Sequence, residues 1–85
     1  MQIEYSPEFR RVFKKLHKDV KLEAVKKEKI FRVNMHDSRL KTHKLSGKLM
    51  GYLAFSITYS YRIIFTIESK NLIRFHSIGG HDMYK

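Results

Sequence analysis

The sequence predicts an α+β fold of order β-α-α-β-β-β, in which two N-terminal helices pack on one face of a small antiparallel sheet. Two patterns predict it: apolar residues recur at helical spacing up to about residue 34, and from residue 49 onward they alternate with polar residues as in strands. A chain of 85 residues is too short for two cored domains, so we expect residues 1–85 to form one domain.

A short strand and a capped helix open the chain. Apolar and polar residues alternate over residues 2–5, which predicts a strand. Ser6, Pro7 and Glu8 then provide a capping hydroxyl, a first-turn proline and an early carboxylate, the usual signals of a helix start. The apolar residues of this helix follow at positions i, i+3, i+4 and i+7: Phe9, Val12, Phe13 and Leu16.

A second helix is predicted from Asp19, which can cap it, to about Asn34. Its apolar residues are less regularly spaced, and the basic residues between them form either a solvated face or part of a binding surface. The segment 34–46 is polar and contains the turn Asp37-Ser38-Arg39.

Three β-rich runs, at about 53–57, 63–67 and 72–78, follow with short connections and predict an antiparallel meander. The helical pair would cover one face of this sheet and leave the other open. Arg62, Arg74 and His76 lie within the runs. Burying these side chains on both faces of a sheet would cost free energy, so we expect the open face to be cationic.

Charge is the strongest signal in the composition. The chain has 18 Lys and Arg against 8 Asp and Glu, a formal net charge of +10. Such a surface attracts polyanions, and nucleic acid is the favoured partner for so small a domain. An acidic protein or an anionic membrane surface would satisfy the same excess.

The absence of cysteine excludes disulfides and Cys-ligated metal sites. The N-terminus shows no signal peptide, and no apolar stretch approaches the roughly 20 residues that span a bilayer, so we expect a cytoplasmic protein that does not enter membranes. P-loop, dinucleotide-binding and nucleophile-elbow motifs are absent, and no histidine pair has the spacing of a zinc hydrolase, so we expect no metal and no cofactor.

Histidines and cations near the predicted open face are the candidates for chemistry. RNA can be cleaved when its 2′-hydroxyl attacks the adjacent phosphate. This reaction needs a base for the hydroxyl, an acid for the departing 5′-oxygen and cations around the phosphate, and histidine and arginine can supply these groups. The glycines at 79–80 would turn the chain before the last histidine. The candidate catalytic residues are His43, Arg62, His81 and Tyr84, and the candidate RNA-binding residues are Lys41, Lys44, Lys48 and Arg74.

Three further readings stay open on the strands. His76 suits a satisfied core histidine better than a functional one, and Arg74 has a second role available as the charge partner of Glu68. Tyr52, Tyr59 and Tyr61 would either stack on bases or serve packing alone.

Three segments carry a resemblance to a known family: LKTHKLSGK at 40–48, YRIIF at 61–65 and IGGHDMY at 78–84. In order and spacing they resemble the RelE/ParE toxin superfamily, closest to its YafQ-like branch. The resemblance implies a type II toxin that cleaves mRNA in the ribosomal A site without a metal and is held inactive by a cognate antitoxin. His43 and His81 match histidines of that branch, Arg62 falls at a phosphate-binding arginine, and Tyr84 lies near a functional aromatic.

The sequence also departs from that family. Leu53 and Phe55 stand where some RelE-like members have catalytic lysines, Ser77 replaces an arginine, and a second strand histidine has no match around Ser56 and Ile57. Two alternatives therefore remain: a gyrase poison of the ParE kind, and a member that binds RNA or antitoxin without cleaving.

Our leading hypothesis is RNA cleavage, and for it we expect His43, Arg62 and His81 to converge on the open face. We also expect an acidic antitoxin with an apolar segment, joined to this chain in a toxin–antitoxin hetero-oligomer.

Overall fold

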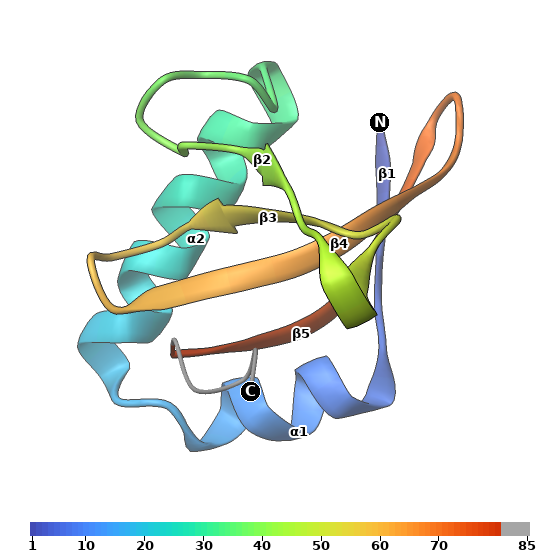
Figure 1. The fold of residues 1–85 in the computed structure, drawn as a ribbon. Helices are drawn as coiled ribbons and strands as arrows, with labels where there is room; N and C mark the ends of the chain where they lie inside the picture. Colours follow the sequence, from blue (N-terminus) through green and yellow to red (C-terminus); the bar gives the residue numbers. More distant parts are fainter. Residues whose placement is uncertain (81–85) are drawn as a thin grey trace.

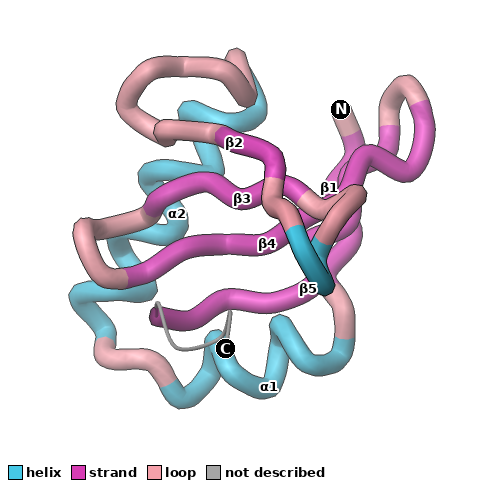
Figure 2. Tube along the Cα trace, viewed as in Figure 1, coloured by secondary structure: helices cyan, strands magenta, loops and turns pink. Residues whose placement is uncertain are grey.

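A computed structural model describes residues 1–80 of the chain, and the predicted order of elements is confirmed with one added edge strand (Figures 1 and 2). The five strands form one sheet in the order β1-β5-β4-β3-β2. The elements are β1 (Gln2–Tyr5), α1 (Pro7–Lys15), α2 (Lys18–Val33), β2 (His43–Lys44), the 3₁₀ turn η1 (Gly47–Leu49), β3 (Leu53–Ser56), β4 (Tyr61–Ser69) and β5 (Leu72–Gly80).

The sheet is mixed rather than wholly antiparallel. Strands β2 to β5 pair antiparallel as predicted, but β1 runs parallel to β5, with Ile3 opposite Ile73 and Tyr5 opposite Phe75. The alternation of apolar and polar residues sets which side chains face the core and carries no strand direction. The prediction of an antiparallel sheet was therefore wrong for this one pair.

Side-chain caps start both helices. The Ser6 hydroxyl accepts a hydrogen bond from the Phe9 N–H (2.9 Å) and donates one to the His76 carbonyl oxygen (2.6 Å), which ties the start of α1 to β5. In α2 the cap is His17, whose Nδ1 accepts from the Asp19 N–H at 3.2 Å, and not Asp19 as predicted. The helix begins at Lys18, two residues earlier than predicted, so the Asp19 carboxylate lies in the first turn, where its negative charge interacts favourably with the positive end of the helix dipole.

The core lies between the helices and one face of the sheet. Four buried phenylalanines form its centre, with ring centroids 4.7 to 6.4 Å apart, and they come from α2, β3, β4 and β5: Phe31, Phe55, Phe65 and Phe75. Burial of these rings is the main favourable contribution to the free energy of folding of so small a chain.

The opposite face is only partly open, which corrects the prediction of a wholly uncovered side. Ala54 and Ile64 point away from the core, yet they are 0% and 4% exposed. The segment between β2 and β3 crosses this face (Figure 1), and its Leu49 and Tyr52 line a cavity together with Ile64. This segment therefore covers part of the face and leaves the rest exposed. Because no helix packs on this face, we call it the uncovered face.

A bulge in β5 changes the direction of His76. Ile64 lies opposite Ser77 while Phe65 lies opposite Phe75, so His76 is the extra residue between them. It faces away from the phenylalanine core, where its Nε2 lies 2.7 Å from the Thr66 hydroxyl. The interpretation of His76 as a core histidine was therefore wrong.

The glycines at 79–80 continue strand β5 and do not form the predicted turn. Gly79 pairs with Arg62 and Gly80 with Tyr61. A Cβ at Gly80 would lie 3.4 Å from the Ser60 carbonyl oxygen, which is about van der Waals contact distance. Within residues 1–80, neither helix is long and apolar enough to cross a lipid bilayer.

Candidate nucleic-acid interface

A cationic hollow of about 400 Å³ lies where β3 turns into β4. We define the cationic hollow by the four basic side chains that line it, which come from α2, the loop after α2 and the start of β4: Lys27, Arg39, Lys41 and Arg62. The β3–β4 turn completes it with backbone, hydroxyl groups and Tyr59, whose side chain is 95% exposed.

Carboxylates outside the cationic hollow hold two of its cations in place. The Lys27 ammonium donates to Glu23 Oε2 (3.3 Å) and to the Ile57 carbonyl oxygen (3.0 Å), which fixes α2 against the β3–β4 turn. Arg39 donates from Nε and Nη2 to the two carboxylate oxygens of Asp37, each at 2.9 Å. These hydrogen bonds lower the pKa of Asp37 to about 2, so the pair stays ionised at neutral pH.

Lys41 reaches the cationic hollow through an unusual backbone conformation. Its φ of 52° is in the left-handed region, which costs free energy for a residue with a Cβ. The loop is anchored on either side: the buried Leu40 accepts a hydrogen bond from the Ser56 N–H (2.7 Å), and the Thr42 hydroxyl donates to the Met35 carbonyl oxygen. Among the described residues, no acidic side chain forms an ion pair with Lys41.

His43 lies beside the cationic hollow, and the same loop orients its ring. Its Nδ1 is 3.0 Å from the Lys41 carbonyl oxygen. Because a carbonyl only accepts, this contact is a hydrogen bond when Nδ1 carries the proton, and the neutral ring then keeps a lone pair on Nε2. That nitrogen is the one suited to accept a proton from a substrate hydroxyl.

The register places His43 and Arg62 on the same face of the sheet. His43 lies opposite Ala54, and Arg62 lies opposite Ser56, two residues further along β3. Two strand spacings and two residues separate the backbones of His43 and Arg62, roughly 12 Å. Side chains of this length can reach one nucleotide from both positions.

The other predicted RNA-binding residues are not gathered at this site. Arg74 lies on the same face but opposite Thr66, four residues along β4 from Arg62, and its Nη1 is 3.1 Å from Glu4 Oε1. Its partner is therefore Glu4 on β1 rather than Glu68. Lys44 pairs with Leu53 and so points to the opposite face from His43.

Lys48 lies in η1, exposed, on the segment that crosses the face. The predicted catalytic residues His81 and Tyr84 lie outside the described residues.

The sequence interpretation did not include Lys27 and Arg39 in the site. No local pattern marks them, because helix packing and the loop after α2 bring them to Arg62.

Strand β3 brings no strong proton-transfer group to this face. The positions matched to family lysines, Leu53 and Phe55, face the helices, and Phe55 is fully buried. Their neighbours on the uncovered face are Ala54 and Ser56. A lysine at Leu53 or Phe55 would therefore enter the core, and catalysis here depends on groups from other elements.

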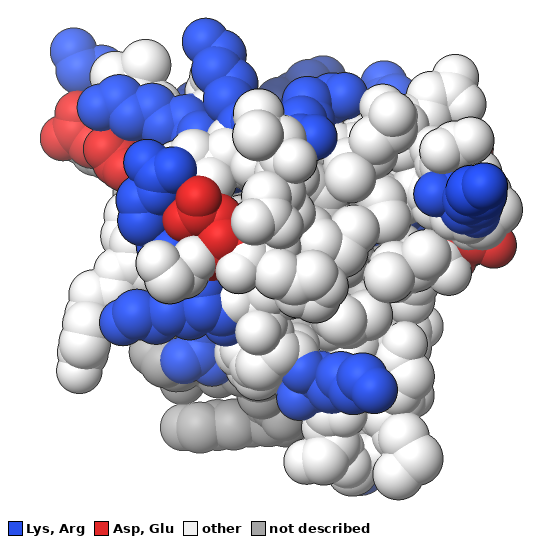
Figure 3. All heavy atoms as spheres, turned by 90° about the horizontal axis from the view of Figure 1, so that it is seen from above, with Lys and Arg blue, Asp and Glu red and all other residues white. Residues whose placement is uncertain are grey.

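Basic side chains dominate the surface around the site. The residues that line the cationic hollow include four basic and no acidic side chains. On the face of the molecule seen in Figure 3, Lys and Arg outnumber Asp and Glu around a mostly uncharged centre. Residues 1–80 contain no group of three or more His, Asp or Glu side chains placed to hold a metal ion.

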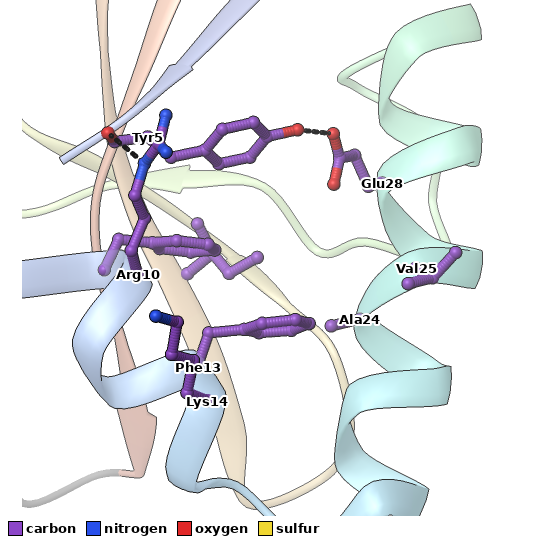
Figure 4. A pocket seen from close by; sticks show the side chains of 9 residues that line it. Tyr5, Arg10, Phe13, Lys14, Ala24, Val25 and Glu28 are labelled. Carbon is purple, nitrogen blue, oxygen red and sulfur yellow. Dashed lines mark hydrogen bonds between the residues drawn. The ribbon is translucent and has the colours of Figure 1, made fainter. Parts of the chain in front are cut away.

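An apolar groove of about 510 Å³ separates α1 from α2 on another side of the molecule (Figure 4). Phe9, Phe13 and Ala24 are among the residues that line it. In Figure 4 the Phe13 ring points toward Ala24. Arg10 and Lys14 lie on its α1 side. These features define the α1–α2 groove.

A hydrogen bond closes one end of the α1–α2 groove. The Tyr5 hydroxyl donates to the Glu28 carboxylate, which also accepts from Arg32 at 3.1 Å. Burial, and then the hydrogen bond to Glu28, raise the pKa of Tyr5, so its hydroxyl stays protonated. The network links β1 to α2.

Toxins of toxin–antitoxin pairs are among the solved structures to which this chain is similar. YafQ from E. coli strain BL21(DE3) is 23% identical with a TM-score of 0.77, covering 98% of this chain and 96% of that chain. A YoeB/ParE toxin from Agrobacterium tumefaciens is 12% identical (TM-score 0.79; 95% and 99% covered). A heterotetrameric YoeB–YefM toxin–antitoxin complex from Staphylococcus aureus contains a chain 24% identical to this one (TM-score 0.76; 95% and 97% covered).

No protein-family model and no curated protein matches the chain. At these identities the structural likeness establishes the fold. It confirms, at that level, the resemblance carried by the segments at 40–48, 61–65 and 78–84. The chain therefore has the fold of the YafQ and YoeB toxins.

Proposed function

We propose that this chain is the toxin of a type II toxin–antitoxin pair and acts in the cytoplasm as a ribosome-dependent mRNA endonuclease whose chemistry uses side chains alone. The observation that carries the proposal is the cationic hollow, where four basic side chains from three segments lie beside His43. The resemblance of the sequence to the YafQ-like branch supports the same function.

The cationic hollow suits the backbone of single-stranded RNA. Lysine and arginine bind phosphate through charge-assisted hydrogen bonds, and arginine adds paired donors. The exposed ring of Tyr59 at the same site gives a surface on which a base can stack. Binding of this kind weakens steeply as salt concentration rises.

Cleavage then needs two proton transfers and stabilisation of the phosphate. Attack by the 2′-hydroxyl forms a bond to phosphorus while the bond to the 5′-oxygen breaks, so a base removes one proton and an acid supplies another. Arg62 and Lys41 stabilise the added negative charge on the phosphate. His43 serves one proton transfer through Nε2, and His81, by its resemblance to the family histidine, serves the other.

Mapping transcript 5′ ends after induction tests this function. We expect new ends within coding regions for the parent chain, and their loss in Arg62→Ala and His43→Ala. Arg74→Ala and His36→Ala are the matched controls, because Arg74 is paired with Glu4 away from the cationic hollow and His36 lies in an exposed loop. Equal cleavage by Arg62→Ala and Arg74→Ala, at equal expression, would refute the assignment.

Two other functions give different outcomes in the same experiment. A ParE-like gyrase poison would leave transcripts intact and alter plasmid topology. The second is an RNA-binding chain that does not cleave, and it is favoured by the absence of a strong proton-transfer group on the uncovered face of β3. It would inhibit growth or translation with no new 5′ ends.

We also expect His81→Ala to abolish cleavage and leave the thermal unfolding of the chain unchanged.

The α1–α2 groove fits the apolar segment of an acidic antitoxin. Its floor is aromatic and aliphatic, Arg10 and Lys14 lie beside it, and the whole chain carries a net charge of +10. The YefM complex gives the precedent of a toxin of this fold bound to its antitoxin.

A pair of substitutions on one helix tests this docking site. Val25 lines the α1–α2 groove and is 46% exposed, whereas Val33 lies outside it and is 88% exposed. We expect Val25→Glu to weaken binding of the acidic protein encoded in the same operon at least tenfold, and Val33→Glu to leave it unchanged. Equal affinities of the two variants would place the antitoxin elsewhere.

A further inference from the structure

A second cavity, of about 440 Å³, opens on the uncovered face of the sheet beside the cationic hollow. Leu49 and Tyr52 from the crossing segment, and Ile64, His76 and Ser77 from the sheet, line it together with the start of α1. Its volume falls within the range of roughly 300–1,000 Å³ that is usual for small-molecule sites. We call it the ring cavity.

Two rings and an apolar floor give the ring cavity its character. The Tyr52 and His76 rings meet edge to face, with centroids 5.1 Å apart. Ile64 and Leu49 supply aliphatic surface beside them. Flat aromatic molecules bind surfaces of this kind through stacking and dispersion.

A hydrogen-bond chain orients the His76 ring. The Glu68 carboxylate only accepts, so the Thr66 hydroxyl donates to it at 2.6 Å and accepts in turn from His76 Nε2 at 2.7 Å. The neutral imidazole then keeps its acceptor on Nδ1. Burial, and then the charge of Arg74, lower the pKa of His76, which favours this neutral form at pH 7.

The charge of the ring cavity differs from that of the cationic hollow. Of the side chains that line it, only Glu8 is formally charged, and Glu8 is a carboxylate. A carboxylate repels phosphate but accepts hydrogen bonds from amino groups on bases. The lining therefore favours the uncharged, aromatic part of a nucleotide over its phosphate.

The register places the two sites one step apart. Arg62 belongs to the cationic hollow and lies opposite Gly79, and Ile64 belongs to the ring cavity and lies opposite Ser77. Residues two apart on one strand are separated by about 7 Å, which is within the reach of a single nucleotide.

We propose that the ring cavity binds an unstacked nucleobase of the RNA whose phosphate lies in the cationic hollow. This inference deepens the proposed function and rests on it for the identity of the polymer. Base and phosphate are thus bound by different side chains, so each can be tested with a probe that carries only one of them.

Chemical-shift mapping on the wild-type full-length chain tests the assignment without any substitution. Cytidine, which carries a base and no phosphate, is titrated to tens of millimolar, because stacking alone gives affinities on the order of millimolar or weaker. We expect it to shift the signals of Tyr52, Ile64 and Ser77. Inorganic phosphate in a parallel titration should instead shift Lys41 and Arg62. Cytidine shifts confined to the cationic hollow, or absent, would overturn the proposal.

Single-stranded RNA with one abasic position tests the same site in a polymer. We expect Tyr52→Leu to weaken binding of the intact RNA about tenfold, and the abasic substitution that weakens wild-type binding to have no further effect on this variant. His76→Gln should give the same coupling, and Met50→Ala, in the same exposed segment but outside the ring cavity, should bind like wild type. Equal sensitivity of wild type and both variants to every abasic position would refute the base site. The proposed function fails separately, when transcripts on ribosomes stay intact although base binding is present.

Discussion

Replacing Lys41 by glycine and by alanine separates the charge of this residue from its backbone conformation. Both substitutions remove the ammonium group, but only glycine accepts the φ of 52° without a steric cost. The left-handed region costs a residue with a Cβ about 1–2 kcal/mol. Glycine gives back about 0.5–1 kcal/mol of this through the larger entropy of the unfolded chain.

The difference leaves Lys41→Gly more stable than Lys41→Ala by up to about 1.5 kcal/mol. For a chain of 85 residues, 1 kcal/mol corresponds to a shift in Tm of roughly 4–8 °C. Thermal unfolding followed by circular dichroism measures this shift directly. A glycine variant that melts below the alanine variant would contradict the strained conformation.

Affinity for RNA should respond to the charge alone. If Lys41 contacts one phosphate of single-stranded RNA, its loss lowers the slope of log K against log salt by about 0.7. We expect the same decrease in both variants, measured by anisotropy of a labelled oligonucleotide. Should Lys41→Gly bind like wild type while Lys41→Ala does not, Lys41 would shape the loop and would not contact the phosphate.

Three further predictions concern stability. Ser6→Ala removes the cap of α1 and a partly buried hydrogen bond to β5, and should lower the free energy of unfolding by about 1–2 kcal/mol in urea titrations. Phe31→Ala should cost about 3–5 kcal/mol, a large part of the roughly 4–13 kcal/mol expected for 85 residues, and its thermal transition should move to much lower temperature or disappear. The lowered pKa of Asp37 means that its pair with Arg39 stabilises the fold above about pH 4 and that this contribution is lost as pH falls toward 2. Asp37→Asn should therefore flatten the dependence of Tm on pH in that range, and an unchanged profile would argue against the pair.

Local signals in the sequence predicted the parts of the fold that depend on neighbours along the chain. The Ser6 cap and the apolar stripe of α1 each arise within a few residues, and both appear in the structure. In β4 the predicted alternation holds for Ile63 and Phe65, which lie in the core, but Ile67 is 52% exposed. The parallel pairing of β1 with β5 and the bulge at His76 depend on residues about 70 and 10 positions away along the chain. The apolar periodicity of a short segment cannot predict such distant pairings.

The candidate site shows the same division. Lys41 and Arg62 were predicted and do line one hollow, because the loop after α2 is hydrogen-bonded to β3 through Leu40 and Ser56. Lys27 and Arg39 join them only through packing that no short segment encodes. Lys44 was predicted beside His43, but adjacent residues of a strand point to opposite faces.

The distribution of chemical groups over the uncovered face implies that affinity and cleavage depend on different residues. The cationic hollow offers several cations for RNA, but the described residues of β3 place no strong proton donor or acceptor on the uncovered face. Salt concentration and the lysines should therefore govern binding, whereas loss of the His43 imidazole should lower cleavage with little change in affinity. If His43→Ala instead weakened RNA binding as much as Arg62→Ala does, the imidazole would be a binding group, and the chain would be better described as an RNA-binding protein than as a nuclease.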